Sequence, residues 1–400
     1  METKRGLTLI ESPMLSFENT EVAFSGKSNS ELKWAYRLFK LIGNNALIAF
    51  GKVATNVALG LRLPITGIIK KTIFKQFCGG ENIEECKPVI NKLHDYGVGT
   101  ILDYSLEAKQ EEAELEKCCQ ELERGIELAK VNREIPFIVF KTSGVIQFSL
   151  LEKYNSQPEN YNEDYLAGIA RVERLCQAAF EADTPILIDA EESWIQDAID
   201  RICEEMMEKF NKEKAIVYNT IQLYRWDRLQ FLKDSFGRGE TSGYKIGVKL
   251  VRGAYMEKER KRAEIKGYKS PIQPDKPATD KDYDLAVEYC VDNKIAVCVG
   301  THNEQSSMLM VNLLDEKGLD KSDSAYYFAQ LLGMSDHISF NLSSKGFNVA
   351  KYVPYGPVKE VIPYLIRRAE ENTSVAGQTS RELSLISAEM KRRKLSASSH

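Results

Sequence analysis

The chain has 400 residues, of which 43% are hydrophobic, and a formal net charge of −4. This length allows one large domain or two, and the apolar content is enough to bury a sizeable core. The small net charge gives no global reason to expect nucleic-acid binding, and no run of 18 uncharged apolar residues predicts a membrane-spanning helix. The N-terminus carries Glu2 and Glu11 without a long apolar stretch, which argues against a signal or transit peptide.

The cysteine and histidine content bounds the chemistry further. None of the eight cysteines forms a C-x-x-C pair, and no spacing resembles a zinc site, so we interpret them as reduced thiols in a cytosol-like compartment. The four histidines are His94, His302, His337 and His400. So few histidines give poor support for a histidine-rich metal centre, and we predict no metal site.

Residues 27–77 form a basic N-terminal segment that holds nine Lys or Arg and one acidic residue among apolar stretches. This pattern predicts basic amphipathic helices. Two interpretations, which do not exclude each other, are a helical arm packed on the main domain and attachment to an anionic membrane surface.

From about residue 87, short β-prone apolar runs alternate with long charged amphipathic stretches. Buried parallel strands joined by helices give this rhythm, and about eight units over roughly 290 residues predict a (β/α)8 TIM-type barrel of class α/β. An open doubly wound sheet is the alternative. The predicted strands are 99–104, 137–141, 185–189, 215–218, 246–251, 296–299, 337–340 and, as a candidate eighth, 351–353.

The rest of the chain completes the predicted domain organisation. Residues 106–133, dense in Glu and Lys, predict a solvated helix face, and 381–394 predict a basic helix followed by a disordered end at 396–400. We therefore expect an N-terminal helical arm over 1–80, the barrel over 81–378 and a basic C-terminal tail over 379–400.

Catalytic residues of such barrels follow the carboxyl ends of the strands. Polar residues stand there in nearly every predicted unit, where buried groups are usually paired or functional. Lys141 could be a salt-bridged lysine, an anion clamp or a Schiff-base nucleophile. Asp189 could cap a helix or serve the site, and His302 could be a core histidine or a cofactor contact.

The segment 352–371 carries the densest signal. Pro357 suits a first helical turn, and Pro363 should bend the helix. Tyr364 shares a face with the adjacent Arg367 and Arg368, a combination that can clamp a carboxylate over an apolar body. We expect Glu371 to pair with Arg368. The alternative is an exposed arginine pair on a surface helix.

Seven stretches together resemble one enzyme family in content and order. The chain is similar to the proline dehydrogenases, most of all to the branch that includes the mitochondrial enzymes. The stretches are YGVGTILDYSLEA (96–108), ILIDAEESWIQDAID (186–200), YNTIQLY (218–224), KLVRGAYMEKER (249–260), THNEQS (301–306), QLLGMSDHISF (330–340) and KYVPYGPVKEVIPYLIRRAEEN (351–372).

This resemblance implies a distorted (β/α)8 barrel that holds non-covalent FAD and oxidises L-proline to Δ1-pyrroline-5-carboxylate. Electrons would then pass to a membrane quinone, and a separate pyrroline-5-carboxylate dehydrogenase would take the product. The lack of a G-x-G-x-x-G motif agrees with FAD on a barrel. The implied location is peripheral at an inner membrane, reached from the cytoplasm in a bacterium or from within a mitochondrion.

The resemblance also implies roles for individual residues. Lys141, Arg367 and Arg368 would bind the carboxylate of the substrate. The walls of the substrate ring would be Tyr255, Leu331, Tyr352 and Tyr364. Asp189 would orient this network and lie by the cofactor. The other residues implied to contact FAD are Gln222, Lys249, Arg252, Gly253, Ala254, Lys276, Thr279, Thr301, His302 and Asn303.

Three other functions stay open. A hydroxyproline dehydrogenase would use the same chemistry, but the resemblance implies a residue smaller than Tyr352 in that branch. A flavin-free lyase could use Lys141 as a Schiff base. A non-catalytic scaffold would be expected to have lost the clamp residues, which are all present.

Overall fold

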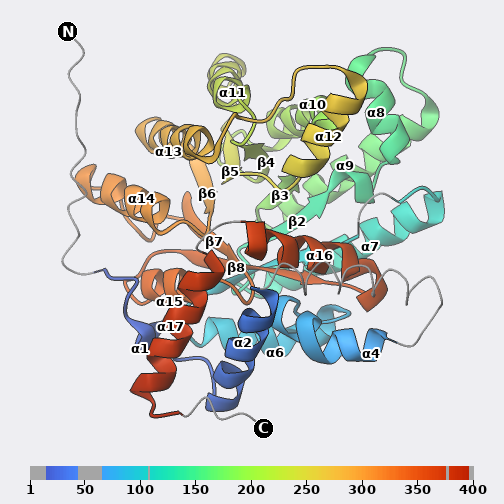
Figure 1. Ribbon diagram of the computed structural model, residues 1–400. Helices are drawn as coiled ribbons and strands as arrows, with labels where there is room; N and C mark the ends of the chain where they lie inside the picture. Colours follow the sequence, from blue (N-terminus) through green and yellow to red (C-terminus); the bar gives the residue numbers. More distant parts are fainter. Residues whose placement is uncertain (1–14, 44–64, 107–108, 375–377, 396–400) are drawn as a thin grey trace.

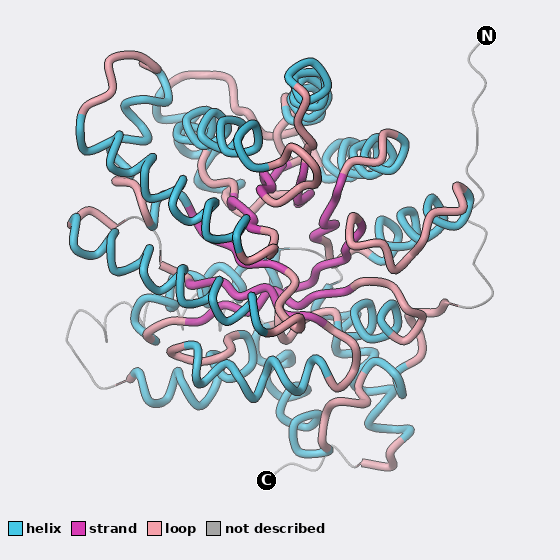
Figure 2. Tube along the Cα trace, turned by 180° about the vertical axis from the view of Figure 1, so that it is seen from behind, coloured by secondary structure: helices cyan, strands magenta, loops and turns pink. Residues whose placement is uncertain are grey.

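The fold is a closed barrel of eight parallel strands that pair in chain order, with β1 beside β8 (Figure 1). The computed structural model describes residues 15–43, 65–106, 109–374 and 378–395. Helices surround the strands, as Figure 2 shows from behind. The predicted (β/α)8 TIM-type barrel is confirmed. The strands are β1 Gly99–Tyr104, β2 Phe137–Lys141, β3 Ile186–Asp189, β4 Val217–Gln222, β5 Gly247–Val251, β6 Ala296–Gly300, β7 Tyr326–Leu331 and β8 Val349–Tyr355.

Most of the helices follow the strands as crossovers, and others precede or extend the barrel. Their bounds are α1 Thr20–Ala23, α2 Asn29–Ile42, α4 Thr66–Ile69, the π-helix η1 Lys70–Phe74, α5 Lys75–Phe77, α6 Ile83–His94, α7 Glu112–Val131, the 3-10 turn η2 Thr142–Gly144, α8 Phe148–Ser156, α9 Glu163–Glu181, α10 Ser193–Phe210, α11 Arg228–Ser242, α12 Met256–Lys266, α13 Lys276–Asp292, α14 Glu304–Glu316, α15 Asp336–Ser343, α16 Val358–Ser374 and α17 Gln378–Arg392.

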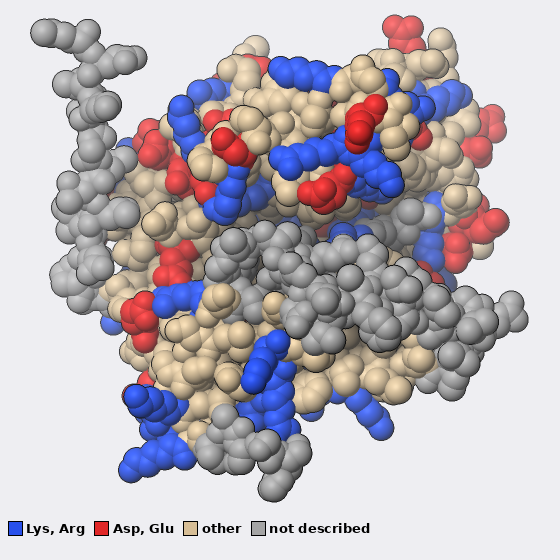
Figure 3. Space-filling view, viewed as in Figure 1, with Lys and Arg blue, Asp and Glu red and all other residues tan. Residues whose placement is uncertain are grey.

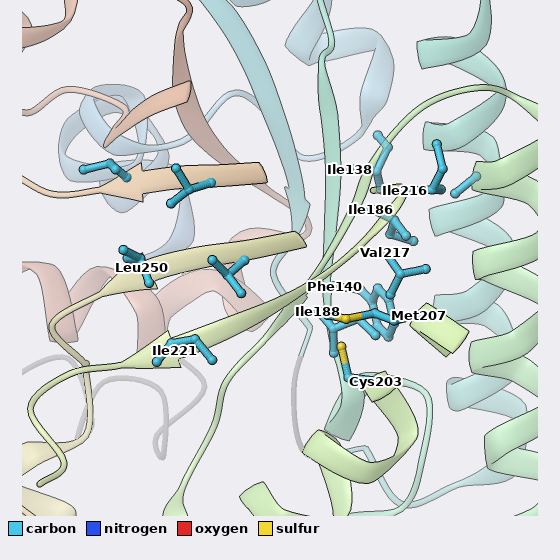
Figure 4. Close-up of a cluster of buried hydrophobic side chains, with 14 of the residues drawn as sticks. Ile138, Phe140, Ile186, Ile188, Cys203, Met207, Ile216, Val217, Ile221 and Leu250 are labelled. Carbon is cyan, nitrogen blue, oxygen red and sulfur yellow. The ribbon is translucent and has the colours of Figure 1, made fainter. Parts of the chain in front are cut away.

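Strand side chains alternate between two apolar cores because successive residues of a strand point to opposite faces. The inner core of the barrel holds aliphatic, aromatic and small residues such as Val139, Phe137 and Ala350. The outer core lies between the strands and the helices, and Figure 4 shows Phe140, Ile188 and their neighbours against Met207 and Cys203 of α10. The same alternation places the last residues of β2 and β3, Lys141 and Asp189, on the inner face at the barrel mouth.

Truncating Phe140 should measure the contribution of the outer core. Its side chain is 1% exposed, so we expect Phe140→Ala to lower the free energy of unfolding by about 3–5 kcal/mol. Urea titration followed by circular dichroism checks this. Val131→Ala, at a side chain that is 80% exposed, is the control and should leave stability nearly unchanged. A similar small change for both variants would contradict the assignment of Phe140 to the core.

One predicted strand is wrong. Residues 337–340 lie in helix α15, and the seventh strand is Tyr326–Leu331, which pairs with β6 from Val297 opposite Tyr326. A run of four residues is too short to reveal its period, and a buried helix and a buried strand then look alike. His337 and Ile338 are buried in α15, which explains the misleading apolar run.

The N-terminal helix α2 packs beside the C-terminal helix α17, as Figure 1 also shows. Ser28 and Glu31 form a capping box at the start of α2, and Leu32, Ala35 and Phe39 of this helix are buried. The described part of the predicted arm is therefore helical and packed, while its membrane contact stays a prediction. Part of the arm (44–64), part of the tail (396–400) and the side chain of Glu371, with its expected pairing, lie outside what the structure describes.

The predicted helix at 381–394 is confirmed as α17. Its bases are largely paired: Arg392 and Arg393 both bind Glu389, and Arg381 binds Glu18 and Glu304. Basic and acidic side chains also intermingle over the upper part of the face shown in Figure 3. Within the described residues, no helix is both long and apolar enough to span a bilayer.

All eight cysteines are buried as free thiols. Burial raises the pKa of Cys86, Cys118 and Cys298 to about 12 and that of Cys119 to about 11. Thiols at such positions stay protonated and act as small apolar groups of the core.

Candidate active site

A cavity of about 630 Å³ opens at the carboxyl ends of the strands, the usual place of the active site in such barrels. Thr279 is buried in α13 but does not line this cavity, and its hydroxyl donates to the carbonyl of Asp275 at 3.2 Å. Its predicted cofactor contact stays a prediction. The other predicted site residues all line the cavity: Lys141, Asp189, Gln222, Lys249, Arg252, Gly253, Ala254, Tyr255, Lys276, Thr301, His302, Asn303, Leu331, Tyr352, Tyr364, Arg367 and Arg368.

Asp189 is the centre of a network that joins four strands, β2, β3, β5 and β8. One carboxylate oxygen, Oδ2, lies 3.1 Å from Nζ of Lys141 and accepts a hydrogen bond of 2.8 Å from the Tyr352 hydroxyl. The other, Oδ1, binds Nζ of Lys249. The Lys249 ammonium also lies over the Tyr352 ring, 5.1 Å from its centroid. The carboxylate therefore fixes two lysines and a tyrosine relative to one another.

The charges explain the protonation states of this network. Burial opposes ionisation of Asp189, yet Lys249 and Lys141 lower its pKa to about 2. Burial and the nearby Asp103 and Asp189 raise the pKa of Tyr352 well above its usual value. At neutral pH, Asp189 is thus an anion, and Tyr352 keeps its proton as a hydrogen-bond donor.

Asp103 at the end of β1 also faces the cavity. Its Oδ2 accepts a 2.5 Å hydrogen bond from the Ser105 hydroxyl. Burial raises the pKa of Asp103, and the neighbouring Asp189 adds to the shift. Asp103 falls within the predicted strand 99–104, and no role was predicted for it.

The two arginines of α16 face the cavity, so an exposed pair on a surface helix is excluded. Arg368 is buried, with its guanidinium 5.2 Å from the ring centroid of Tyr364. The Arg367 guanidinium lies 5.9 Å from the ring centroid of Tyr255, at the start of α12. Guanidinium groups over aromatic rings combine an anion-binding fork with an apolar wall, as the spacing in the sequence suggested.

Arg252, just after β5, organises the opposite side of the cavity. Its guanidinium binds Asp280 at 2.7 Å, the Thr301 hydroxyl at 2.8 Å and the Ser306 hydroxyl at 3.0 Å. Asp280 also binds Lys276 at 2.5 Å. This network ties the loops after β5 and β6 to helix α13.

His302 and Gln222 complete this side. His302 Nδ1 lies 2.9 Å from the Ser335 hydroxyl, and burial together with Lys351 and Arg368 lowers the pKa of His302 to about 3. Its imidazole is therefore neutral at physiological pH. Gln222 donates to the carbonyl of Glu191 at 2.7 Å, and Asn303 caps helix α14 by accepting from the backbone N–H of Gln305 and Ser306.

The donor set fits a flavin dinucleotide. Lys249 and Arg252 offer positive charge to anionic groups, and His302, Thr301 and Gln222 offer hydrogen bonds to a polar ring edge. The Thr220 hydroxyl is buried, lines the cavity and has no partner within the described chain, so it can bind a ligand. The residues present therefore suit the cofactor implied by the resemblance.

The sequence missed several residues that line the cavity. Glu304 follows β6, Gln330 lies in β7, Ser335 and His337 follow β7, and Arg381 and Glu382 come from α17. Glu304 could have been identified from its position after the predicted strand 296–299, whereas Gln330 could not, because β7 was not predicted. No local signal marks Arg381 and Glu382, because only tertiary packing brings α17 to the barrel mouth.

Comparison with known proteins decides the family. The profile described as proline dehydrogenase matches residues 86–381 of the chain. The chain belongs to the proline dehydrogenase family. Membership of this family makes it an oxidoreductase of the proline dehydrogenase type and confirms the resemblance seen in the sequence.

Several relatives extend this match. Mitochondrial proline dehydrogenase 1 of Dictyostelium discoideum is 32% identical over 94% of this chain and 74% of its own length. The Homo sapiens protein of that name is 41% identical over 56% of this chain and 38% of its own length. A hydroxyproline dehydrogenase of Xenopus laevis is 30% identical over 95% of this chain and 90% of its own.

A solved structure shares the fold of this proline dehydrogenase family member. Proline utilization A of Bdellovibrio bacteriovorus superposes with a TM-score of 0.70 at 20% sequence identity and covers 89% of this chain. This chain spans only 38% of that longer protein. At this identity the comparison supports the barrel fold and nothing finer.

Proposed function

We propose that this proline dehydrogenase family member oxidises L-proline to Δ1-pyrroline-5-carboxylate with bound FAD. One observation carries the proposal: Lys141, Arg367 and Arg368 line the same cavity as three tyrosines and the donor set that suits a flavin. Three cations bind a carboxylate, and the aromatic walls match a small apolar ring.

In this proposal the residues of the chain bind and orient the substrate. Lys141 and the arginine pair hold the carboxylate, and Tyr255, Leu331, Tyr352 and Tyr364 enclose the pyrrolidine ring. Fixing both ends of a small substrate removes most of its freedom and favours one geometry for hydride transfer. FAD, when bound, would supply the two-electron redox chemistry as the acceptor of the hydride. Asp189 keeps Lys141 and Tyr352 in place throughout.

The flavin-free lyase is disfavoured by the contacts of Lys141. A Schiff base needs a neutral amine, whereas the Asp189 carboxylate 3.1 Å away stabilises the ammonium form. Hydroxyproline oxidation stays the second candidate because a relative bears that name. The bulk of Tyr352, whose hydroxyl is fixed by Asp189, favours proline over its 4-hydroxylated form.

An absorption spectrum tests the proposal directly. The purified protein should show a flavin band that bleaches on anaerobic addition of L-proline and much less with 4-hydroxyproline. Tyr352→Ala should make the bleaching by L-proline and by 4-hydroxyproline more similar, because the smaller side chain leaves room for the 4-hydroxyl group. A flavin band that ignores L-proline would reject the substrate, and a protein that takes up no FAD would reject the cofactor.

The physiological partners follow from the same proposal. Electrons would leave the reduced flavin for a membrane quinone, and a separate pyrroline-5-carboxylate dehydrogenase would consume the product. The mitochondrial names of several relatives favour peripheral binding at the mitochondrial inner membrane, with the cytoplasmic face of a bacterial membrane as the alternative. Flotation with vesicles that contain anionic lipid would test the arm over 1–80 as the contact.

A further inference from the structure

The loop between β7 and α15, residues 332–335, is held from several distant parts of the chain. Gln76, at the end of the described arm, donates to the carbonyl of Gly333 at 2.9 Å. The fully buried Lys351 of β8 donates to the carbonyl of Met334 at 2.5 Å. Glu382 of α17 accepts a 2.5 Å hydrogen bond from the backbone N–H of Ser335. The loop that borders the cavity is thus fixed by both terminal regions.

Ser335 has a conformation that needs such support. Its φ is +49°, in the left-handed region, which is costly for a residue with a side chain. Its backbone N–H points at Glu382, and its hydroxyl lies 2.9 Å from Nδ1 of His302. Ser335 therefore connects a carboxylate of the C-terminal helix to an imidazole at the cavity.

Glu382 is suited to this task by its environment. It is 3% exposed and lines the cavity together with Ser335 and His302. The next residue back, Arg381, binds Glu304 at 2.8 Å, and Glu304 binds His337 Nε2 at 3.0 Å. Farther along the same helix, Glu389 binds Arg392, Arg393 and Thr20 away from the cavity.

From this chain of contacts we infer that Glu382 is a positioning residue of the cofactor site. It holds Ser335 in its strained conformation so that the serine hydroxyl fixes the ring and tautomer of His302 toward the flavin. The inference rests on the proposed function for the identity of the cofactor. It adds a C-terminal helix outside the barrel to the residues that shape the site.

Affinity for FAD provides the first test. Glu382→Ala leaves the buried N–H of Ser335 without an acceptor, and we expect FAD binding to weaken about tenfold. Glu382→Gln keeps an acceptor oxygen and should restore most of the affinity. With FAD saturating, the KM for L-proline should stay at the wild-type value in both variants, because the carboxylate clamp is unchanged.

Two further variants separate positioning from simple loss of structure. Glu389→Ala removes a buried carboxylate from the same helix and should leave FAD affinity unchanged, although it loosens α17. Ser335→Gly relieves the strained backbone and keeps the N–H, but it lacks the hydroxyl that binds His302. It should therefore be stable and still lose FAD affinity.

A ¹⁵N NMR spectrum of the imidazole nitrogens reports the tautomer of His302 and does not depend on cofactor binding. The chain has only four histidines, so His302→Gln assigns the signal in protein labelled at histidine. We expect one neutral tautomer in the wild type and in Glu382→Gln, and averaged tautomers in Glu382→Ala and Ser335→Gly.

The outcomes distinguish this inference from the proposed function. A wild type that binds no FAD rejects the proposed function and, with it, the role toward the flavin. If the wild type binds FAD and Glu382→Ala binds equally well, or if Glu389→Ala loses as much affinity, Glu382 has no positioning role. An unchanged His302 tautomer in Glu382→Ala would also overturn the inference.

Discussion

Asp189→Asn is expected to lower turnover at least about a hundredfold and to destabilise the protein by about 3–5 kcal/mol, since it removes the negative charge that the buried Lys249 and the half-buried Lys141 both contact. Lys141 and Lys249 both bind this carboxylate, and it is 8% exposed. The amide has the size of the acid and can still accept from Tyr352. The change therefore isolates the charge.

Steady-state kinetics with L-proline and urea unfolding of the same preparation measure the two effects. Asp183→Asn is the matched control, because Asp183 pairs with Lys214 on the surface, where both side chains are more than half exposed. An exposed pair contributes little, so the control should change neither quantity appreciably. Full activity and stability in Asp189→Asn would mean that the lysines do not depend on this carboxylate.

Arg368→Lys is expected to raise the KM for L-proline by about ten- to a hundredfold while kcat falls less. A planar guanidinium binds a carboxylate with two parallel hydrogen bonds, and an ammonium cannot reproduce that geometry. Arg368 is buried beside Tyr364, so the shorter, more strongly hydrated lysine also loses its contact with the ring.

Arg238→Lys supplies the comparison for this substitution. Arg238 of helix α11 binds Glu204 on the outside of the barrel, and it is not among the residues that line the cavity. Its replacement should leave the KM unchanged. If Arg368→Lys also kept the wild-type KM, the carboxylate would be bound by other groups, and the proposed orientation of the substrate would have to be revised.

Much of the site could be predicted because its residues follow from the alternation of the strands. In β2 and β3, the inward-facing residues are apolar until the last one, which is Lys141 in β2 and Asp189 in β3. The change from apolar to charged residues therefore indicates in the sequence where each strand reaches the mouth of the barrel. The same logic missed β7, because its start, Tyr326-Tyr327, is less plainly apolar than the strands before it. Residues 337–340, which belong to the buried helix α15, were predicted as the seventh strand instead.

The support of the site from the chain termini could not be predicted. Lys27 in the arm binds Asp336 at 3.0 Å, and Asp336 binds the fully buried Lys351 at 2.9 Å. The first contact joins residues more than 300 positions apart, and Lys27 lies outside all seven stretches that resemble the family. Only the folded chain shows that a basic arm and a basic tail, each interpretable as a solvated segment, provide groups to the loops around the cavity.

The buried cysteines make the protein a convenient host for site-directed labelling. Since all eight thiols are shielded and those with the smallest shift still have a pKa near 11, maleimides should react slowly with the native protein. A cysteine introduced at an exposed position, such as Leu166→Cys on α9, would then be the fastest site to modify. A fluorophore or spin label placed there would report on the folded enzyme without removal of any native cysteine.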